Sequence, residues 1–551
     1  MEALNYCWTL LKWLEEHVTS IFAGSCIRPQ CDARCGPQTA SSFKSSSRTL
    51  QLNSREKTTS ILSIALFALL ATVISFQACG HSLSGNPIAL ENAKPGDPSW
   101  VLTNPATQRE IEGYASETSV NRGEKISFFV STQDPRYSID IYRLGWYGGI
   151  GARRMSPTAT ESGIQQPVPL PDPVTGLIEC QWSAPYTLAI PKNPLDPTDW
   201  ASGVYLAKLT GIPSSKQSYV IFVVRDDARF SRYLFHSSVT TFQAYNNWGG
   251  KSLYDYNSTG GRAAKVSFNR PYGLGNQPSA ASGVGAGEFL TTNVPEVVSP
   301  YPTGWEYNMV RFLERNGYDV TYCTDIDLHE NADIVLHHRA LLTVGHDEYW
   351  SWEMRANVTN ARDAGVNLGF FAANVSYWQI RFEPSQISGV ADRTQVCYKD
   401  ASDPVTGSRQ TLQWRQLGMP EAAFIGVMYF TDRINSDIVV QNTGNWVFAT
   451  TDLNDGDHLS GLLGYEVDQV TSSSPTGLIT LAKSPTSPGP SGQDSNMSLY
   501  TAASGATVFA TGSMQWNWGL DDYNAPALRP VLLSPAAQEI TQNVLTKLGE
   551  Q

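Results

Sequence analysis

The chain has 551 residues, of which 41% are hydrophobic and 16% charged, so it can bury a large core and is not disordered throughout. Its formal net charge of −12 argues against nucleic-acid binding, which needs a basic surface to neutralise phosphates. Trp, Tyr, Phe, Gly and Pro are abundant, a composition typical of many short strands joined by structured loops.

Residues 59–80 form an uncharged and mostly apolar segment, and Arg55 and Lys57 precede it. This length suits a signal peptide or a membrane anchor, and the upstream basic residues predict that the following chain is exported. Cys79 leaves lipoprotein attachment as a further alternative. We therefore expect residues 1–58 to be a poorly ordered tail with an uncertain translation start. The body is predicted to be extracytoplasmic, either secreted or held at a membrane.

Residues 85–228 alternate between apolar and polar side chains, as in 125–128 and 138–141, with turn residues such as 121–123 between the runs. This period of two predicts an antiparallel β-sandwich with one buried face on each sheet. The region lacks clustered His, Cys or paired acids, so support or binding is its expected role.

Residues 229–551 change to strand–helix alternation, with apolar runs at 340–345 and 366–372 and a strand expected at 235–241. Apolar strands separated by amphipathic helices predict a mostly parallel, doubly wound α/β domain covered on both faces. The predicted organisation is thus an all-β domain followed by an α/β domain.

Capping residues mark the expected helix ends. Glu306 completes a capping box that opens at Thr303, and Gly317 suits the left-handed end of that helix. Ser351 is predicted to open a second helix, and Ser534, followed by proline, the last one.

Ligands of an open α/β sheet bind beyond the carboxyl ends of its strands. Three predicted strand ends carry polar and aromatic residues: 245–248, 346–348 and Asn374. If these strands are neighbours in the sheet, the three groups converge on one site.

His346 and Glu348 occupy the strand-to-helix turn at which hydrolases of this architecture place a Ser or Cys nucleophile. Covalent catalysis by a Ser or Cys nucleophile is therefore disfavoured. A carboxylate at a helix N-terminus stays ionised and suits a hard metal ion or a general base. The alternative is that Glu348 only caps its helix and His346 only packs. Glu466 is a candidate second carboxylate.

Four tyrosines surround the first of these strand ends: Tyr245, Tyr254, Tyr256 and Tyr272. A single tyrosine is more often a packing residue. To act as a phenolate it needs a strongly polarising cation, because the phenol pKa is about 10.

Three segments resemble the large (beta) subunit of N,N-dimethylformamidase and the wider group that shares its C-terminal domain. They are 343–385, which contains GHDEYW, 243–254 (QAYNNWGGKSLY) and 141–155 (IYRLGWYGGIGARRM). The resemblance covers most of residues 100–550. For the α/β part it fits a class I glutamine amidotransferase-like fold.

The resemblance implies a mononuclear, ferric, non-haem iron held by two tyrosines and one glutamate. Such a site hydrolyses a small formamide to an amine and formate. Glu348 matches the glutamate ligand, Tyr245 one tyrosine and Tyr272 the other. An all-oxygen set of hard anions suits a hard cation.

Three further residues match the family's substrate pocket: His346 as the adjacent histidine, Asn374 as a pocket asparagine and Glu466 as an acid that activates water. The expected partners are a small-molecule substrate and either a small second subunit or further copies of the chain. No nucleic acid is expected.

Two other functions stay open on the sequence alone. One is a non-catalytic cell-envelope protein that binds glycans or another ligand through Trp-rich loops such as 516–518. The other is a glycosidase that uses Glu348 and Glu466, which requires the two carboxyl groups to lie roughly 5–10 Å apart. A disulfide between Cys323 and Cys397 is compatible with export.

Overall fold

The computed structural model describes residues 85–550 except for 194, 274–283, 291–303 and 487–491. Residues 80–551 form one compact unit. The predicted tail (1–58) and export segment (59–80) lie outside the described residues. Within the described ranges, no helix is both long enough and apolar enough to cross a membrane.

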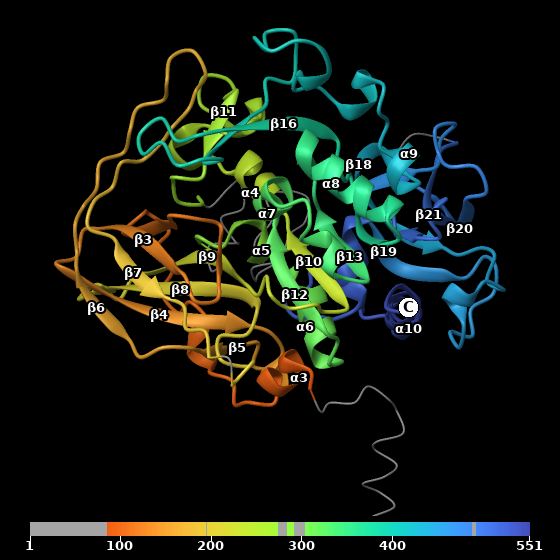
Figure 1. Cartoon of the computed structure of the whole chain (residues 1–551), viewed down its shortest axis with the longest axis horizontal. Coiled ribbons are helices and arrows are strands. Elements are labelled where there is room, and N and C mark those ends of the chain that lie inside the picture. Colours follow the sequence, from red (N-terminus) through yellow and green to blue (C-terminus); the bar gives the residue numbers. More distant parts are fainter. Residues whose placement is uncertain (1–84, 194, 274–283, 291–303, 487–491, 551) are drawn as a thin grey trace, which may run out of the picture. The chain divides into compact units, whose positions relative to one another are not determined.

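The described chain is a mixed α/β structure with five sheets, in agreement with the predicted α/β and β content. Residues before 226 build two of the sheets (Figure 1). One has the strand order β1-β3-β7, and the other has the order β2-β9-β8-β4-β5 with β6 also paired to β4. The strands are β1 (Ile111–Ala115), β2 (Ser119–Asn121), β3 (Lys125–Thr132), β4 (Arg136–Leu144), β5 (Ala152–Arg154), β6 (Ala159–Ser162), β7 (Tyr186–Ala189), β8 (Gly203–Ile212) and β9 (Gln217–Arg225).

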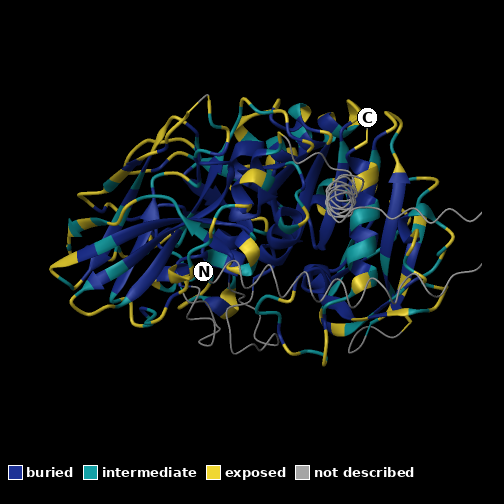
Figure 2. Ribbon diagram, turned by 90° about the horizontal axis from the view of Figure 1, so that it is seen from below, coloured by how far each residue is buried: buried dark blue, intermediate teal, exposed yellow. Residues whose placement is uncertain are grey.

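These two sheets share one apolar core. Ile126 and Phe128 of β3 pack in the same cluster as Ile139 and Ile141 of β4. Side chains that are two residues apart in a strand point to the same face, so the alternation in the sequence places every second residue in this core. Figure 2 shows the strands as mostly buried and the exposed residues mainly in the loops.

The largest sheet has seven strands in the order β12-β10-β13-β15-β22-β21-β20. Its first five strands are parallel to one another, and the pairings of β22 with β21 and of β21 with β20 are antiparallel. Figure 1 shows β12, β10 and β13 side by side. The strands are β10 (Tyr233–Ser237), β12 (Val320–Thr324), β13 (Ala340–His346), β15 (Asn367–Ala373), β20 (Ile479–Pro485), β21 (Asp494–Thr501) and β22 (Thr507–Ala510).

Helices cover both faces of this sheet. On one face Leu342 of β13 packs with α6 and α10, and on the other Leu341 packs with α7, α8 and α9. Leu341 and Leu342 point to opposite faces, and both are apolar because neither face of the sheet meets solvent. These helices are α6 (Tyr307–Arg315), α7 (Asp325–Glu330), α8 (Trp352–Asp363), α9 (Ala422–Ile425) and α10 (Pro535–Leu548); the short α3 (Pro87–Asn92) and α5 (Gly287–Leu290) lie elsewhere.

Two smaller sheets complete the described fold. One has the order β11-β17-β16-β14, and the other is the pair β18-β19. Their strands are β11 (Lys265–Ser267), β14 (Tyr349–Ser351), β16 (Trp378–Glu383), β17 (Thr394–Val396), β18 (Met428–Val439) and β19 (His458–Gln469).

The prediction of a strand at 235–241 is wrong for its second half. Strand β10 ends at Ser237, and helix α4 (Val239–Tyr245) follows. The carboxylate of Glu306 accepts hydrogen bonds from the Ser237 hydroxyl (2.8 Å) and the Ser238 N–H (2.9 Å). Inside the helix, the Thr240 N–H donates to Asp325 Oδ2 (3.0 Å). The first N–H groups of a helix have no partner within the helix, so two carboxylates distant in sequence stabilise its start here.

Three other helix ends follow the prediction. Ser351 caps α8 and Ser534 caps α10, each through its side-chain oxygen. Gly317 has φ 69° just after α6, where a left-handed residue ends the helix. Thr303, the start of the predicted capping box, lies outside the described residues, and the Glu306 side chain instead accepts from Ser237 and Ser238 just before α4.

The disulfide between Cys323 and Cys397 is absent. Both cysteines are free and buried, in different apolar clusters.

One further cluster contains Tyr219 and Val223 together with Phe235 and Val310, so a continuous core crosses the expected domain boundary at 228/229. That boundary stays a prediction.

The buried His338 is expected to make the stability of the fold depend on pH. Burial lowers the pKa of His338 from 6.5 to about 4, against the raising effect of the Ser231 carbonyl, which lies 3.0 Å from Nδ1. The unfolded chain therefore binds more protons between these pH values. We expect the free energy of unfolding to fall by up to ~3 kcal/mol through this residue as the pH drops from 6.5 to 4.

Urea denaturation of His338→Gln and wild-type protein at pH 7 and pH 4.5 measures this effect. The stability difference between the two should shrink or reverse at the lower pH. The exposed His458 offers a control in His458→Gln. Parallel pH profiles of wild type and His338→Gln would contradict the prediction.

Candidate metal centre and active site

Three oxygen-bearing side chains from separate elements meet beyond the carboxyl end of β13. Glu348 lies in the turn between β13 and β14, Tyr245 is the last residue of α4, and Tyr254 lies in the following loop. The hydroxyl of Tyr245 donates to Glu348 Oε2 (2.8 Å), and that of Tyr254 lies 2.8 Å from both carboxylate oxygens. Two phenols thus share one buried carboxylate.

The fold holds Glu348 from both sides. Its backbone N–H donates to Thr241 Oγ1 of α4 (2.9 Å), and its carbonyl accepts from the backbone of Tyr377 and Trp378. Burial raises the pKa of Glu348, but His346, Lys399 and Tyr254 together lower it by more, so the net pKa is below its usual value. Glu348 is therefore an anionic ligand or hydrogen-bond acceptor at neutral pH.

His346 lies between three carboxylates. Its Nε2 is 3.5 Å from Glu348 Oε2 and 3.4 Å from Glu466 Oε2, and its Nδ1 is 3.4 Å from Glu288 Oε2. These contacts are ion pairs rather than short hydrogen bonds. Burial lowers the pKa of His346, yet the carboxylates, chiefly Glu466, raise it well above its ordinary value. The imidazole is thus protonated in this arrangement.

Asn374 and Glu466 form the opposite side of the site. Asn374 Nδ2 donates to Glu466 Oε2 (2.6 Å), and its backbone N–H donates to Asp468 Oδ1 (2.9 Å). Burial raises the pKa of Glu466 more than the positive charge of His346 lowers it. A carboxylate with a raised pKa is a better proton acceptor for work near neutral pH.

A cavity of about 470 Å³ joins these groups. Its wall contains the five residues Tyr245, His346, Glu348, Asn374 and Glu466, together with Tyr254. The rest of the lining is mainly aromatic: Tyr256, Tyr377, Trp378, Tyr429 and Tyr465, with Asp432 and Arg433.

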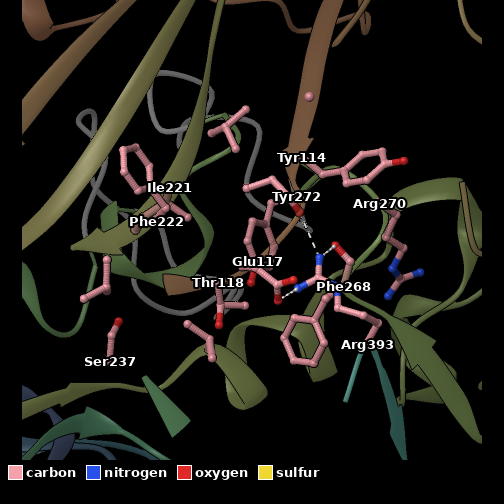
Figure 3. Close-up of a pocket in the computed structure, with 15 residues that line it drawn as sticks. Tyr114, Glu117, Thr118, Ile221, Phe222, Ser237, Phe268, Arg270, Tyr272 and Arg393 are labelled. Carbon is pink, nitrogen blue, oxygen red and sulfur yellow. Dashed lines mark hydrogen bonds and ion pairs between the residues drawn. The ribbon is translucent and has the colours of Figure 1, made fainter. Parts of the chain in front are cut away.

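The structure brings together every predicted site residue except Tyr272. Tyr272 lines a separate and much smaller cavity with Arg270, Phe268 and Arg393 (Figure 3). The Arg270 guanidinium donates to the backbone carbonyls of Asn246, Trp248 and Lys251. These bonds tie the segment of Arg270 and Tyr272 to the backbone of the loop 246–251, away from Glu348.

Tyr254 takes the place expected for Tyr272. Gly249 and Gly250 have φ 75° and 90°, which lets the loop reverse direction. The Leu253 N–H then donates to the carbonyl of Ala244 (2.9 Å), and the rings of Tyr245 and Tyr254 lie 4.5 Å apart. The Gly-Gly pair after the first strand end was the sequence signal for this reversal.

A second group of candidate metal ligands lies beneath the site. A ligand atom from each of His236, Asp325 and Asp347 lies within 4.8 Å of the others. His236 Nδ1 is 3.0 Å from Asp325 Oδ1 and its Nε2 is 2.7 Å from Thr343 Oγ1, so a metal ion must replace one of these hydrogen bonds. The sequence did not reveal this group, because its members follow or belong to three different strands.

The Trp-rich loop proposed for glycan binding does not expose its tryptophan rings to solvent. Trp516 and Trp518 are 0% and 1% exposed, within the short helix η10 (Met514–Gly519). Aromatic platforms for sugars must be exposed on one face. These two rings are packing residues.

The fold and the site define a mixed α/β protein with a cavity lined by the carboxylates of Glu348 and Glu466 and by several tyrosines. The family model described as "N,N-dimethylformamidase beta subunit-like, C-terminal" matches residues 138–527, and the chain belongs to this family. No curated protein matches the chain. The solved structure "mmIFT52 N-terminal domain" is 10% identical over 43% of this chain and 87% of that chain, with a TM-score of 0.24, too low to support an argument.

Proposed function

We propose that this protein is a metal-dependent hydrolase of small amides with a formamide-type C–N bond. In this proposal a mononuclear ferric ion is held by Tyr245, Tyr254 and Glu348. The observation that carries the proposal is the meeting of two phenol oxygens on one buried carboxylate, each at 2.8 Å, in a cavity with a second carboxylate. Membership of the family supports the same reaction class.

The chemistry of the donor set fits such an ion. Burial, and next the charge of Glu348, raise the pKa of both Tyr245 and Tyr254 well above the usual value. The phenols therefore keep their protons unless a strongly charged cation replaces them. Three hard oxygen anions then suit a hard trivalent ion better than a soft one.

A ferric ion bound here would act as a Lewis acid that polarises the amide carbonyl. Glu466 accepts a proton from the attacking water, and Asn374 Nδ2 keeps that carboxylate oriented. As the C–N bond breaks, this proton passes to the leaving nitrogen, which departs as the amine. His346 Nε2 lies between the two carboxylates, 3.5 Å from Glu348 Oε2 and 3.4 Å from Glu466 Oε2, and helps to fix their relative positions.

The cavity accommodates more than the smallest formamides. Its volume of about 470 Å³ lies within the range of pockets that bind drug-sized ligands. Tyr377, Trp378 and Tyr429 offer aromatic contacts beyond the reacting groups. We therefore propose that formamides with a larger or aromatic substituent on nitrogen are substrates along with dimethylformamide.

Several wider features belong to the same proposal. They are a β-sandwich at 85–228, an amidotransferase-like α/β domain at 229–551, export of the chain, and association with a small subunit or with further copies. The engagement of Glu348 by two phenols supports a ligand role more than the role of a glycosidase nucleophile.

Replacing Tyr254 tests the metal site directly. After incubation of the full chain with iron, we expect about one iron per chain and a visible phenolate-to-iron absorption band in the wild type. Tyr254→Phe should lose the band and most of the iron, because one of the three oxygen ligands is removed. Metal analysis and visible spectroscopy measure both quantities.

Tyr272→Phe is the matched control, since it removes the same hydroxyl from a partly buried tyrosine outside the cavity. It should retain the iron and the band. Loss of iron from Tyr272→Phe but not from Tyr254→Phe would reverse the assignment, and a colourless wild type without iron would overturn the proposed function.

A further inference from the structure

We propose that Lys399 and Tyr349 are positioning residues that direct the Tyr254 oxygen as a metal ligand. The inference rests on the proposed function. Lys399 Nζ donates to Tyr349 Oη (2.8 Å), and Tyr349 Oη donates to Tyr254 Oη (2.6 Å). Tyr254 Oη in turn lies 2.8 Å from both oxygens of Glu348.

The chemistry of these groups gives the chain of hydrogen bonds one direction. An ammonium group can only donate, so the Tyr349 oxygen must accept from Lys399. The single hydroxyl hydrogen of Tyr349 is then available for Tyr254. Tyr254 accepts this bond, and its own hydrogen is left for Glu348. When a cation replaces that last hydrogen, Tyr349 still donates to the resulting phenolate oxygen and stabilises its charge.

Aromatic rings hold the ammonium group in place. Lys399 Nζ lies 3.5 Å from the centroid of the Tyr254 ring, 5.0 Å from that of Trp378 and 5.2 Å from that of Tyr349. A cation over a ring face is attracted by the ring, and more strongly if that ring becomes a phenolate. Lys399 therefore acts on Tyr254 twice, through the ring face and through the hydroxyl of Tyr349.

The elements that carry this group differ from those that carry the ligands. Tyr349 begins β14 and pairs in register with Trp378 of β16, and Lys399 follows β17 in the same four-stranded sheet. The Lys399 backbone N–H donates to the Thr411 carbonyl (3.0 Å), which fixes the start of its side chain. This small sheet thus supports the ligand loop from outside the seven-stranded sheet.

Two substitutions test the inference in the full chain. Tyr349→Phe removes only the hydroxyl, and Lys399→Met removes the charge but keeps a long side chain. Each is expected to weaken iron binding by ~10–100-fold, as for other residues that support metal ligands. Each should also move the phenolate-to-iron band to longer wavelength, because the phenolate oxygen loses a stabilising hydrogen bond. Chelator competition and visible spectroscopy are the measurements.

Three controls separate positioning from general damage. Lys399→Arg keeps a donor and should restore most of the affinity, and Lys483→Met, at an exposed lysine, should have no effect. The double variant Lys399→Met/Tyr349→Phe should bind iron more weakly than Tyr349→Phe but less weakly than the sum of the two single effects, because one of the two routes from Lys399 passes through the Tyr349 hydroxyl. Thermal unfolding by circular dichroism verifies that each variant is folded.

Wild-type affinity and an unshifted band in Tyr349→Phe would overturn the inference, as would fully additive effects in the double variant. In both cases the proposed function stands, provided that the wild type binds iron. If the wild type binds no iron, the proposed function fails first and the inference fails with it.

Discussion

Replacing Glu348 by Gln is expected to abolish iron binding and to reduce amide hydrolysis by at least ~10³-fold. The amide is almost the same size as the carboxylate but carries no charge. It can accept from Tyr245 and Tyr254 only through its one oxygen, whereas both carboxylate oxygens are engaged in the native site. The Lewis-acid contribution of a bound metal is worth several kcal/mol, which converts to a loss of this size.

Formate release, iron content and the visible band should all be lost together in Glu348→Gln. Glu353→Gln, five residues further along on the exposed side of α8, is the control and should retain all three. If Glu348→Gln keeps its iron, Glu348 is not a ligand, and the metal lies elsewhere, with His236, Asp325 and Asp347 as the next group to replace.

Replacing Glu466 by Gln is expected to separate chemistry from metal binding. This carboxylate is the proposed proton acceptor, and Asn374 Nδ2 can still donate to the remaining amide oxygen. Loss of a general base typically costs 10²–10⁴-fold in rate. Formate release should fall by about this factor while the iron content and the phenolate band stay unchanged.

Steady-state kinetics with dimethylformamide and with an N-aryl formamide, alongside metal analysis, measure this separation. Glu383→Gln in β16, at a partly exposed carboxylate, is the matched control. A Glu466→Gln protein that loses its iron would show that Glu466 is a ligand. An unchanged rate would show that another group takes the proton.

Much of the site was predictable because its members belong to local patterns. His346 and Glu348 follow directly on a buried strand, and Asn374 follows the neighbouring strand, paired with it in parallel. The carboxyl ends of parallel strands share one edge of a sheet, so their convergence requires only that these strands be neighbours. Cap residues such as Ser351 and Ser534 act on their own helices for the same local reason.

Other features depended on partners far away in the sequence. Helix 239–245 starts where Glu306 and Asp325 accept the N–H groups of Ser238 and Thr240, so Tyr245 reaches the site from the end of a helix. Tyr254 lies beside Glu348 and Tyr272 does not, because a loop reversal and the contacts of Arg270 decide which phenol faces the cavity.

By itself, the amino-acid sequence determined the alternation of strands and helices, the cap residues and the chemistry available at three strand ends. Only the tertiary structure decided the order β12-β10-β13-β15, the second tyrosine and the support of that tyrosine by Tyr349 and Lys399. Periodicity and caps act within a few residues, whereas strand order and side-chain contacts between distant segments are set by how the whole core packs.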